Sequence, residues 1–258
     1  PDGIRGRWKY SEKDWIEKYI LQVKSIVDEI YRKNKKLSCF FVESILGCGG
    51  QIILPPNYLK EVFKIIKKRK ALLIVDEVQT GFGRVGNHFW GFEEHKIIPD
   101  IVTLGKPMGN GHPIAAVVTT KKIANKFNNG MEYFNSFGGN PVSCSIGNSV
   151  LDVIENEKLQ KNAKVIGEYF LKSLNQIKLE FPKFISEVRG RGLFLGLYFI
   201  NIENNVPNAK LATLIINEMR QRGILLSTDG PYHNVIKIKP PLTFNKKNVD
   251  LVCFELKN

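Results

Sequence analysis

Three ionisable side chains mark the ends of three short apolar runs in the sequence. Glu43, Asp76 and Lys106 each lie at or just past the end of such a run. Carboxylates and an amine are the residue types of acid-base and covalent catalysis. Because the carboxyl ends of parallel strands meet at one edge of a sheet, where ligands bind, we expect the three side chains to converge on a functional site.

The elements that would position these residues alternate between strand and helix, which predicts a largely parallel α/β sheet. Apolar residues at helical spacing and a Ser11/Asp14 pair spaced like a capping box predict the first helix. We expect strands at 37–42, 71–75, 100–104 and 114–120, and helices at 11–34, 55–70, 141–154 and 157–179.

The pattern changes after residue 180, where short strands dominate. This change predicts a second, smaller α+β domain, so that residues 1–180 and 181–258 form two domains. Its expected strands are 184–189, 193–200, 224–227 and 235–239, and its expected helices are 208–222 and 246–256.

A GxGxxG pattern at Gly81, Gly83 and Gly86 suggests a dinucleotide site at first sight. Two acidic residues and an aromatic loop surround it, however, and no helical pattern follows. The glycines are better interpreted as turn residues.

Composition excludes several classes of function. The net charge of +13 comes largely from scattered lysine clusters, without a motif that reads nucleic acid. No apolar run approaches the roughly 20 residues that span a bilayer. The four cysteines and four histidines have no metal-site spacing. We therefore expect no nucleic-acid partner, no membrane span, no metal and reduced cysteines in an intracellular protein.

Six ordered blocks between residues 40 and 244 make the interpretation more specific. They are FFVESILGCGG (40–50), DEVQTGFGR (76–84), GKPMGNGHP (105–113), SFGGNP (136–141), VRGRGLFLG (188–196) and KIKPPLTF (237–244). Together they resemble the class III aminotransferase family of fold-type I pyridoxal-phosphate enzymes. The resemblance implies a mostly parallel sheet with helices on both faces, plus a small α+β C-terminal domain.

This resemblance implies pyridoxal 5'-phosphate as the cofactor. Lys106 would form its Schiff base and later take the substrate's Cα proton, and Asp76 would keep the ring nitrogen protonated. Gln79 would hydrogen-bond the phenolic oxygen, and Glu43 would lie near the substrate. Ser136 replaces a threonine that in many members reaches the cofactor phosphate of the neighbouring subunit, which implies a homodimer or homotetramer with shared active sites.

One position departs from the family pattern. Many aminotransferases of this class carry an arginine three residues before the proline of the last block, where it forks onto a substrate carboxylate. This sequence has Lys237 there, and lysine is a poor bidentate partner. Within the family, the strings most similar to the phospho-lyase branch are GNHFWGF (86–92), GKPMGNGHP (105–113), MEYFNSFGGNPVSC (131–144) and LLSTDGPYHNVIKIKPP (225–241). Lys237 and Lys239 could meet a substrate phosphate, or they could be a structural pair at a strand edge.

The resulting hypothesis is a phospho-lyase that eliminates phosphate and ammonia from a small-molecule amine such as ethanolamine phosphate or phosphohydroxylysine. The alternatives are a class III transaminase of the alanine-glyoxylate type and a truncated noncatalytic remnant. The sequence opens without methionine, and we expect it to be a C-terminal piece that alone binds the cofactor weakly. Mitochondrion and cytoplasm both remain open as its compartment.

Overall fold

The computed structural model describes residues 1–258, which group by their contacts into two compact units. Unit 1 comprises residues 1–44, 54–81 and 90–153, and unit 2 comprises residues 45–53, 82–89 and 154–258. Contacts alone do not test the division into domains 1–180 and 181–258, which stays a prediction. No helix in either unit has both the length and the apolar character that crossing a membrane requires.

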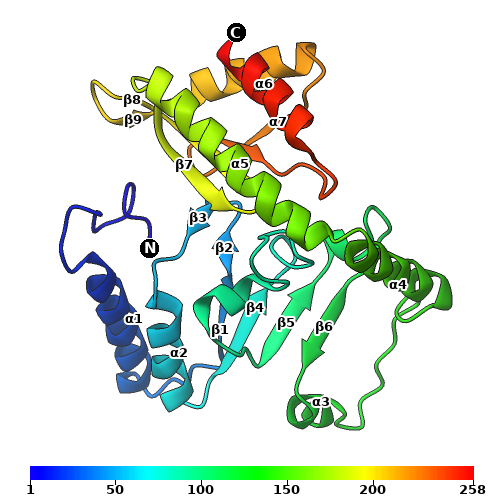
Figure 1. The fold of residues 1–258 in the computed structure, drawn as a ribbon. Helices are drawn as coiled ribbons and strands as arrows, with labels where there is room; N and C mark the ends of the chain where they lie inside the picture. Colours follow the sequence, from blue (N-terminus) through cyan, green and yellow to red (C-terminus); the bar gives the residue numbers. More distant parts are fainter. The chain divides into compact units, whose positions relative to one another are not determined.

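Unit 1 is built on a four-stranded sheet with the order β1-β4-β5-β6 (Figure 1). Strands β1, β4 and β5 run parallel, and β6 pairs antiparallel with β5. The four strands predicted for this part of the chain are confirmed, and the sheet is largely parallel as expected. Their bounds are β1 Cys39–Glu43, β4 Leu72–Asp76, β5 Ile101–Leu104 and β6 Ala116–Thr119.

Helix α2 packs on the face of this sheet toward which Leu73 and Val75 of β4 point. These two side chains are fully buried, while Leu72, Ile74 and Asp76, which alternate with them, are half-buried. Helix α1 packs on α2 in turn. The helices of unit 1 are α1 Trp15–Arg32, α2 Tyr58–Lys68, α3 Lys121–Phe127 and most of α4 Pro141–Asn156, with 3-10 turns η1 Gly91–His95 and η2 Lys106–Met108.

The predicted capping box of the first helix is wrong. Asp14 occupies the N-cap position of α1, but its side chain caps no backbone amide. Its carboxylate instead pairs with Lys18, which also binds Glu12. A charged partner one turn along the helix therefore replaces the expected capping interaction.

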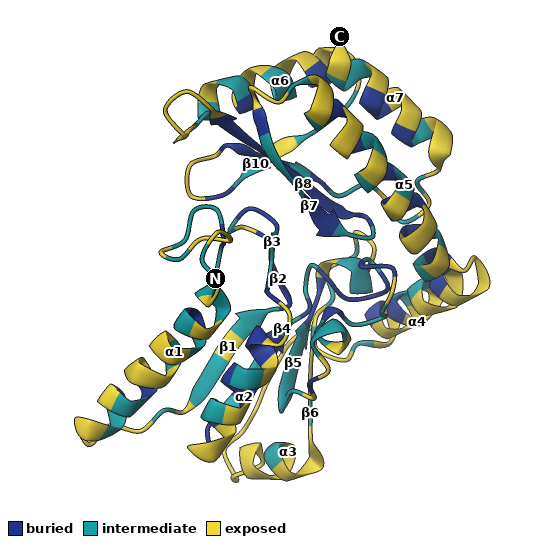
Figure 2. Cartoon of the chain, turned by 60° about the vertical axis from the view of Figure 1, so that its left-hand side comes forward, coloured by how far each residue is buried: buried dark blue, intermediate teal, exposed yellow.

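Unit 2 contains an antiparallel sheet with the order β10-β11-β8-β7. Seven of the eight residues of β8 are buried, whereas β7 mixes buried and intermediate residues (Figure 2). The bounds are β2 Ile45–Leu46, β3 Ile52–Ile53, α5 Leu159–Glu180, β7 Ile185–Arg191, β8 Phe194–Asn201, β9 Val206–Pro207, α6 Ala209–Gln221, β10 Ser227–Asp229, β11 Val235–Ile238 and α7 Lys246–Lys257.

Two predictions for unit 2 have different outcomes. The inward stripe expected on the helix at 157–179 is confirmed, since Ala163, Phe170 and Leu174 of α5 are all fully buried. The strand expected at 224–227 begins only at Ser227. The Ile224 amide is still bonded to Met219 at the end of α6, and β10 pairs with β11 only from Ser227 onward.

Candidate active site

The structure brings Glu43, Asp76 and Lys106 to one edge of the unit 1 sheet. Glu43 on β1 is paired in register with Asp76 on the parallel strand β4. Asp76 is paired in turn with Thr103 on β5, and Lys106 follows Thr103 by three residues. Neighbouring strands that run parallel end at the same edge, so the convergence expected from the apolar runs is present.

Two hydrogen bonds orient the acidic side of this edge. The Val78 amide donates to Asp76 Oδ1 at 2.8 Å, which fixes the carboxyl group at the end of β4. Gln79 Nε2 donates to Glu43 Oε1 at 3.2 Å. Asp76 is half-buried on the face of the sheet opposite the buried Val75. Three of the predicted site residues therefore lie together on two neighbouring strands and the turn after β4.

Lys106 is held by an unusual backbone conformation. Its φ of +38° lies in the left-handed region, which non-glycine residues rarely adopt. The turn around it is tight, because a side chain at Gly109 would lie 2.1 Å from the His112 carbonyl oxygen. His112 Nε2 lies 2.7 Å from Ser143 Oγ and ties the turn to the first turn of α4. The loop therefore presents an exposed lysine from a constrained backbone.

The chemistry of this donor set fits pyridoxal phosphate. A primary amine suits the cofactor's aldehyde, a carboxylate suits its ring nitrogen, and an amide donor suits its phenolic oxygen. Lys106, Asp76 and Gln79 supply these three groups from adjacent strand ends. No cluster of three or more histidine, cysteine, aspartate or glutamate side chains could hold a metal ion.

The remaining predicted site residues, Ser136, Lys237 and Lys239, come from other segments of the chain. Ser136 is exposed in the stretch between α3 and α4. Lys237 lies on β11 of unit 2, where its Nζ donates to Asp229 Oδ1 at 3.2 Å, and Lys239 follows directly after the end of β11. The ammonium of Lys239 lies 5.0 Å from the centre of the Phe194 ring. The roles expected for these three residues at the cofactor or the substrate stay predictions.

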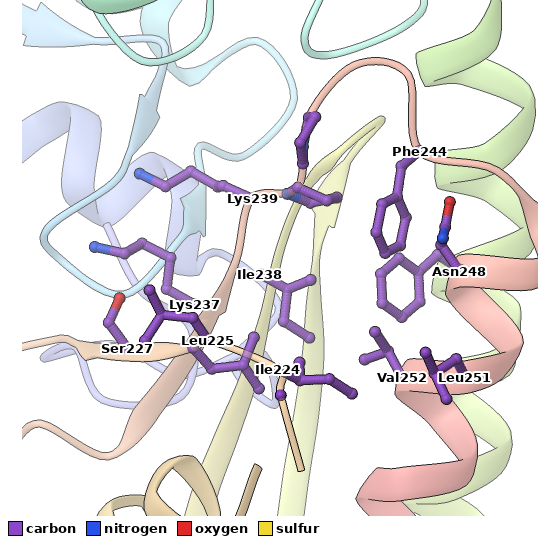
Figure 3. Close-up of a pocket in the computed structure, with 15 residues that line it drawn as sticks. Ile224, Leu225, Ser227, Lys237, Ile238, Lys239, Phe244, Asn248, Leu251 and Val252 are labelled. Atoms are coloured by element: carbon purple, nitrogen blue, oxygen red, sulfur yellow. The ribbon is translucent and has the colours of Figure 1, made fainter. Parts of the chain in front are cut away.

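Figure 3 shows how the two lysines relate to a cavity of about 660 Å³ in unit 2. Their side chains extend to one side of β11, while Ile238 points the other way, toward Phe244 and Val252. The alternation of a β-strand explains this separation of charged and apolar side chains. The cavity is therefore mostly apolar.

Sequence reasoning missed Glu77, the residue after Asp76. Its side chain is fully buried, and its carboxylate accepts four hydrogen bonds. The donors are the hydroxyls of Ser44 and Thr80 and the backbone amides of Gly91 and Phe92. The available signal in the sequence was a second acidic residue directly after the acid at the end of β4. Consecutive side chains of a strand point to opposite faces of the sheet, so the second acid would point away from the face that carries Asp76.

The glycine pattern after β4 behaves as a turn, as interpreted from the sequence. Gly83 and Gly86 have φ values of +76° and +80°, and the next element is the short 3-10 turn η1 and not an α-helix. A side chain at Gly83 would lie 2.8 Å from Gln160, and one at Gly86 would lie 2.6 Å from Lys164. The glycines therefore let this loop pack directly against α5.

Comparison with known proteins places these features in context. A family model described as class-III aminotransferase matches residues 6–258. The chain is 44% identical to an alanine-glyoxylate aminotransferase 2-like protein of Drosophila melanogaster, covering 97% of this chain and 52% of that protein. It is 38% identical to ethanolamine-phosphate phospho-lyase homolog 1 of Caenorhabditis elegans, covering 96% and 56%. Some matching relatives are named as mitochondrial.

Among solved structures, the fold is similar to a phospholyase from Arthrobacter in complex with phosphoethanolamine. The TM-score is 0.93 at 36% identity, and the match covers 100% of this chain and 61% of that one. The chain spans about half the length of the curated relatives it matches.

Proposed function

The chain belongs to the class III aminotransferases, whose members are pyridoxal-phosphate-dependent enzymes, and on that basis we propose that the full-length protein is a phospho-lyase. It would eliminate phosphate and ammonia from a small phosphorylated amine of the ethanolamine phosphate or phosphohydroxylysine type. The similarity to a solved phospholyase supports this choice within the family.

The observation that carries the proposal is the side chain at position 237. Lys237 Nζ forms an ion pair with Asp229 Oδ1 at 3.2 Å. Its ammonium group cannot make the two parallel hydrogen bonds that an arginine makes to a carboxylate. A substrate without a carboxylate, such as ethanolamine phosphate, needs no such pair of bonds. A lysine is also an ordinary phosphate partner, so Lys237 and Lys239 are candidates to attract the phosphate.

Each of the site residues at the sheet edge would have a separate role in the reaction. Lys106 would carry pyridoxal phosphate covalently and move the substrate's Cα proton at Nζ. Asp76 would hold the proton on the ring nitrogen, and Gln79 would donate to the phenolic oxygen. The bound cofactor supplies an electron-accepting ring. The Cα–H bond and the adjacent C–O bond to phosphate break, water enters, and phosphate, ammonia and an aldehyde leave.

A transaminase of the alanine-glyoxylate type is the second candidate. The 44% identity to a protein with that name favours it. The two reactions differ in what they require, because a transaminase keeps the amino group on the cofactor until a keto acid accepts it. A lyase needs no acceptor.

A phosphate-release assay separates these candidates. The full-length protein, loaded with pyridoxal phosphate, is given ethanolamine phosphate or phosphohydroxylysine without any keto acid. We expect equal amounts of phosphate and ammonia, and none from Lys106→Ala. Phosphate release that depends strictly on added keto acid would contradict the lyase. If the loaded protein consumes no amine, whether or not a keto acid is added, the result would support the noncatalytic remnant.

We also propose that the full-length protein is a homodimer. An aromatic segment that runs from the last residue of α3 to the first turn of α4 leaves large apolar side chains exposed. Figure 2 shows this part of unit 1 mainly in the exposed colour. Exposed apolar clusters of this kind mark interaction surfaces. The aromatic segment comprises Phe127, Met131, Tyr133, Phe134, Phe137 and Val142. It surrounds Ser136, the residue expected to reach the cofactor of the neighbouring subunit.

A further inference from the structure

We propose that Glu77 is a positioning residue for the candidate active site, and this inference rests on the proposed function. Glu77 touches none of the groups expected to contact substrate or cofactor. Its carboxylate instead joins the backbone segments that carry them, through the four hydrogen bonds it accepts within unit 1. These contacts define the Glu77 cluster, which comprises Ser44, Glu77, Thr80, Gly91 and Phe92.

The cluster and the candidate site are adjacent along the chain at three points. Ser44 directly follows Glu43, and Glu77 directly follows Asp76. In the same way Thr80 directly follows Gln79. Each of these three cluster residues shares a peptide bond with a site residue, so a shift of its backbone also shifts the backbone of that site residue. Ser44, Glu77 and Thr80 are each buried to within 1% of complete burial, so none of them can exchange its partner for bulk water.

Both oxygens of Glu77 are needed because each faces one hydroxyl and one backbone amide. Oε1 accepts from Ser44 Oγ and from the Phe92 amide at 2.8 Å. Oε2 accepts from Thr80 Oγ1 and from the Gly91 amide, both at 2.8 Å. A hydroxyl can turn to accept instead, but a backbone N–H cannot. Glutamine would thus set its NH₂ group against a fixed backbone donor in either orientation.

Packing closes the cluster from the side of η1. A side chain at Gly91 would lie 2.9 Å from Ser44 Cβ and 3.0 Å from Thr80 Cβ. His95, at the other end of η1, places Nε2 3.0 Å from the Ser44 carbonyl oxygen. Both ends of η1 therefore contact Ser44, the residue that follows Glu43 at the end of β1. Gly91→Ala would disturb the same cluster through volume alone, without changing any charge.

The test uses the full-length protein loaded with pyridoxal phosphate. Glu77→Gln and Gly91→Ala are compared with Leu59→Ala, which removes a fully buried side chain of α2 in the same unit. We expect both cluster variants to lower kcat about 10- to 100-fold, by analogy with the loss of a residue that hydrogen-bonds to a metal ligand, with KM nearly unchanged. The induced circular dichroism of the bound cofactor should also change in both. Leu59→Ala should reduce thermal stability without either effect.

A second measurement does not depend on the cofactor. Hydrogen exchange at the amides of Val78, Gly91 and Phe92 should accelerate in Glu77→Gln, because Val78 donates to Asp76 and the other two donate to Glu77. Unchanged exchange at Val78 in a folded Glu77→Gln protein would overturn the positioning role. So would kcat and dichroism equal to those of Leu59→Ala. A parent protein that binds no cofactor would instead refute the proposed function, and the exchange result would still decide the role of Glu77.

Discussion

At the scale of single residues, the carboxyl group of Asp76 is oriented by the backbone of the turn that follows β4. It is fixed by the Val78 amide at 2.8 Å and lies in register with Glu43. An oriented carboxylate next to a ring nitrogen stabilises the protonated ring far more than a mobile one does, because the protein dipoles need no reorganisation.

Asp76→Asn should therefore remove most of the activity while leaving the protein folded. We expect kcat to fall about 100- to 1000-fold, the loss typical of one preorganised electrostatic partner, while borohydride still traps the cofactor on Lys106. Asp100→Asn is a matched control, because Asp100 lies just before β5 and pairs with Lys67. An Asp76→Asn enzyme with parental kcat would contradict the role assigned to Asp76.

The cysteines provide a test that is independent of the cofactor. Burial, followed by the nearby Asp250 carboxylate, raises the pKa of the Cys253 thiol to about 11. Cys48 and Cys144 are exposed. Since the thiolate is the reactive form, alkylation at pH 8 should label Cys48 and Cys144 and spare Cys253 until the protein unfolds. Peptide mass spectrometry measures the labelling, and early modification of Cys253 in folded protein would disprove it.

The same shift has a consequence for stability. A raised pKa means that the folded protein holds the thiol proton more tightly than the unfolded chain does. The contribution of Cys253 to stability is therefore complete below about pH 9 and is lost as the pH rises through about 11. Cys253→Ser, whose hydroxyl does not titrate in this range, should lack this part of the alkaline decline in urea denaturation.

At the scale of the elements, two helical glycines differ in the space around them. A side chain at Gly167 in α5 would lie 2.3 Å from the backbone of Gly192 in the turn between β7 and β8. A side chain at Gly147 in α4 would meet only Ile114 at 3.5 Å and Met108 at 3.9 Å. The first glycine permits a close approach of helix and sheet, while the second is buried but has room for a methyl group.

Alanine substitutions at these positions should have opposite effects. Gly167→Ala should destabilise the protein by about 1–3 kcal/mol through overpacking. Gly147→Ala should stabilise it by about 0.5–1 kcal/mol, because alanine restricts the unfolded chain and favours the helix. Urea denaturation measures both free energies of unfolding. A neutral Gly167→Ala would show that α5 does not need this contact.

At the scale of the whole molecule, the aromatic segment is the surface on which the proposed dimer depends. Phe134 is 79% exposed, and Phe137 is 82% exposed. Side chains of this size gain most of their binding energy in a desolvated interface. The same surface would carry Ser136 to the neighbouring active site.

Phe134→Asp should accordingly weaken association of the full-length protein. We expect a loss of about 2 kcal/mol or more, roughly a 30-fold weaker dimer, with a parallel loss of cofactor affinity. Sedimentation velocity over a range of concentrations measures the first effect. Ile98→Asp is the control, because Ile98 is 87% exposed but lies outside the aromatic segment. Equal effects of both variants would argue against an interface at this segment.

Local signals in the sequence were enough to predict most of the longer helices and strands and the acidic and basic residues that follow three of the strands. Apolar runs and helical periodicity are local signals, so they predicted β1, β4 and β5 and the edge shared by Glu43, Asp76 and Lys106. The predicted family also followed from six short blocks, and the family model confirmed it. Local patterns were less reliable at element ends, as the absent capping box of α1 shows.

The hydrogen-bond and ion-pair partners of these residues, in contrast, depend on the tertiary structure. The hydrogen bond between Ser44 and Glu77 joins residues 33 positions apart, and the Asp229–Lys237 pair depends on the register of β10 with β11. The left-handed backbone of Lys106 was likewise absent from any local pattern. Such contacts are selected by the packing of whole elements, because a buried polar group takes whichever partner the fold places within reach.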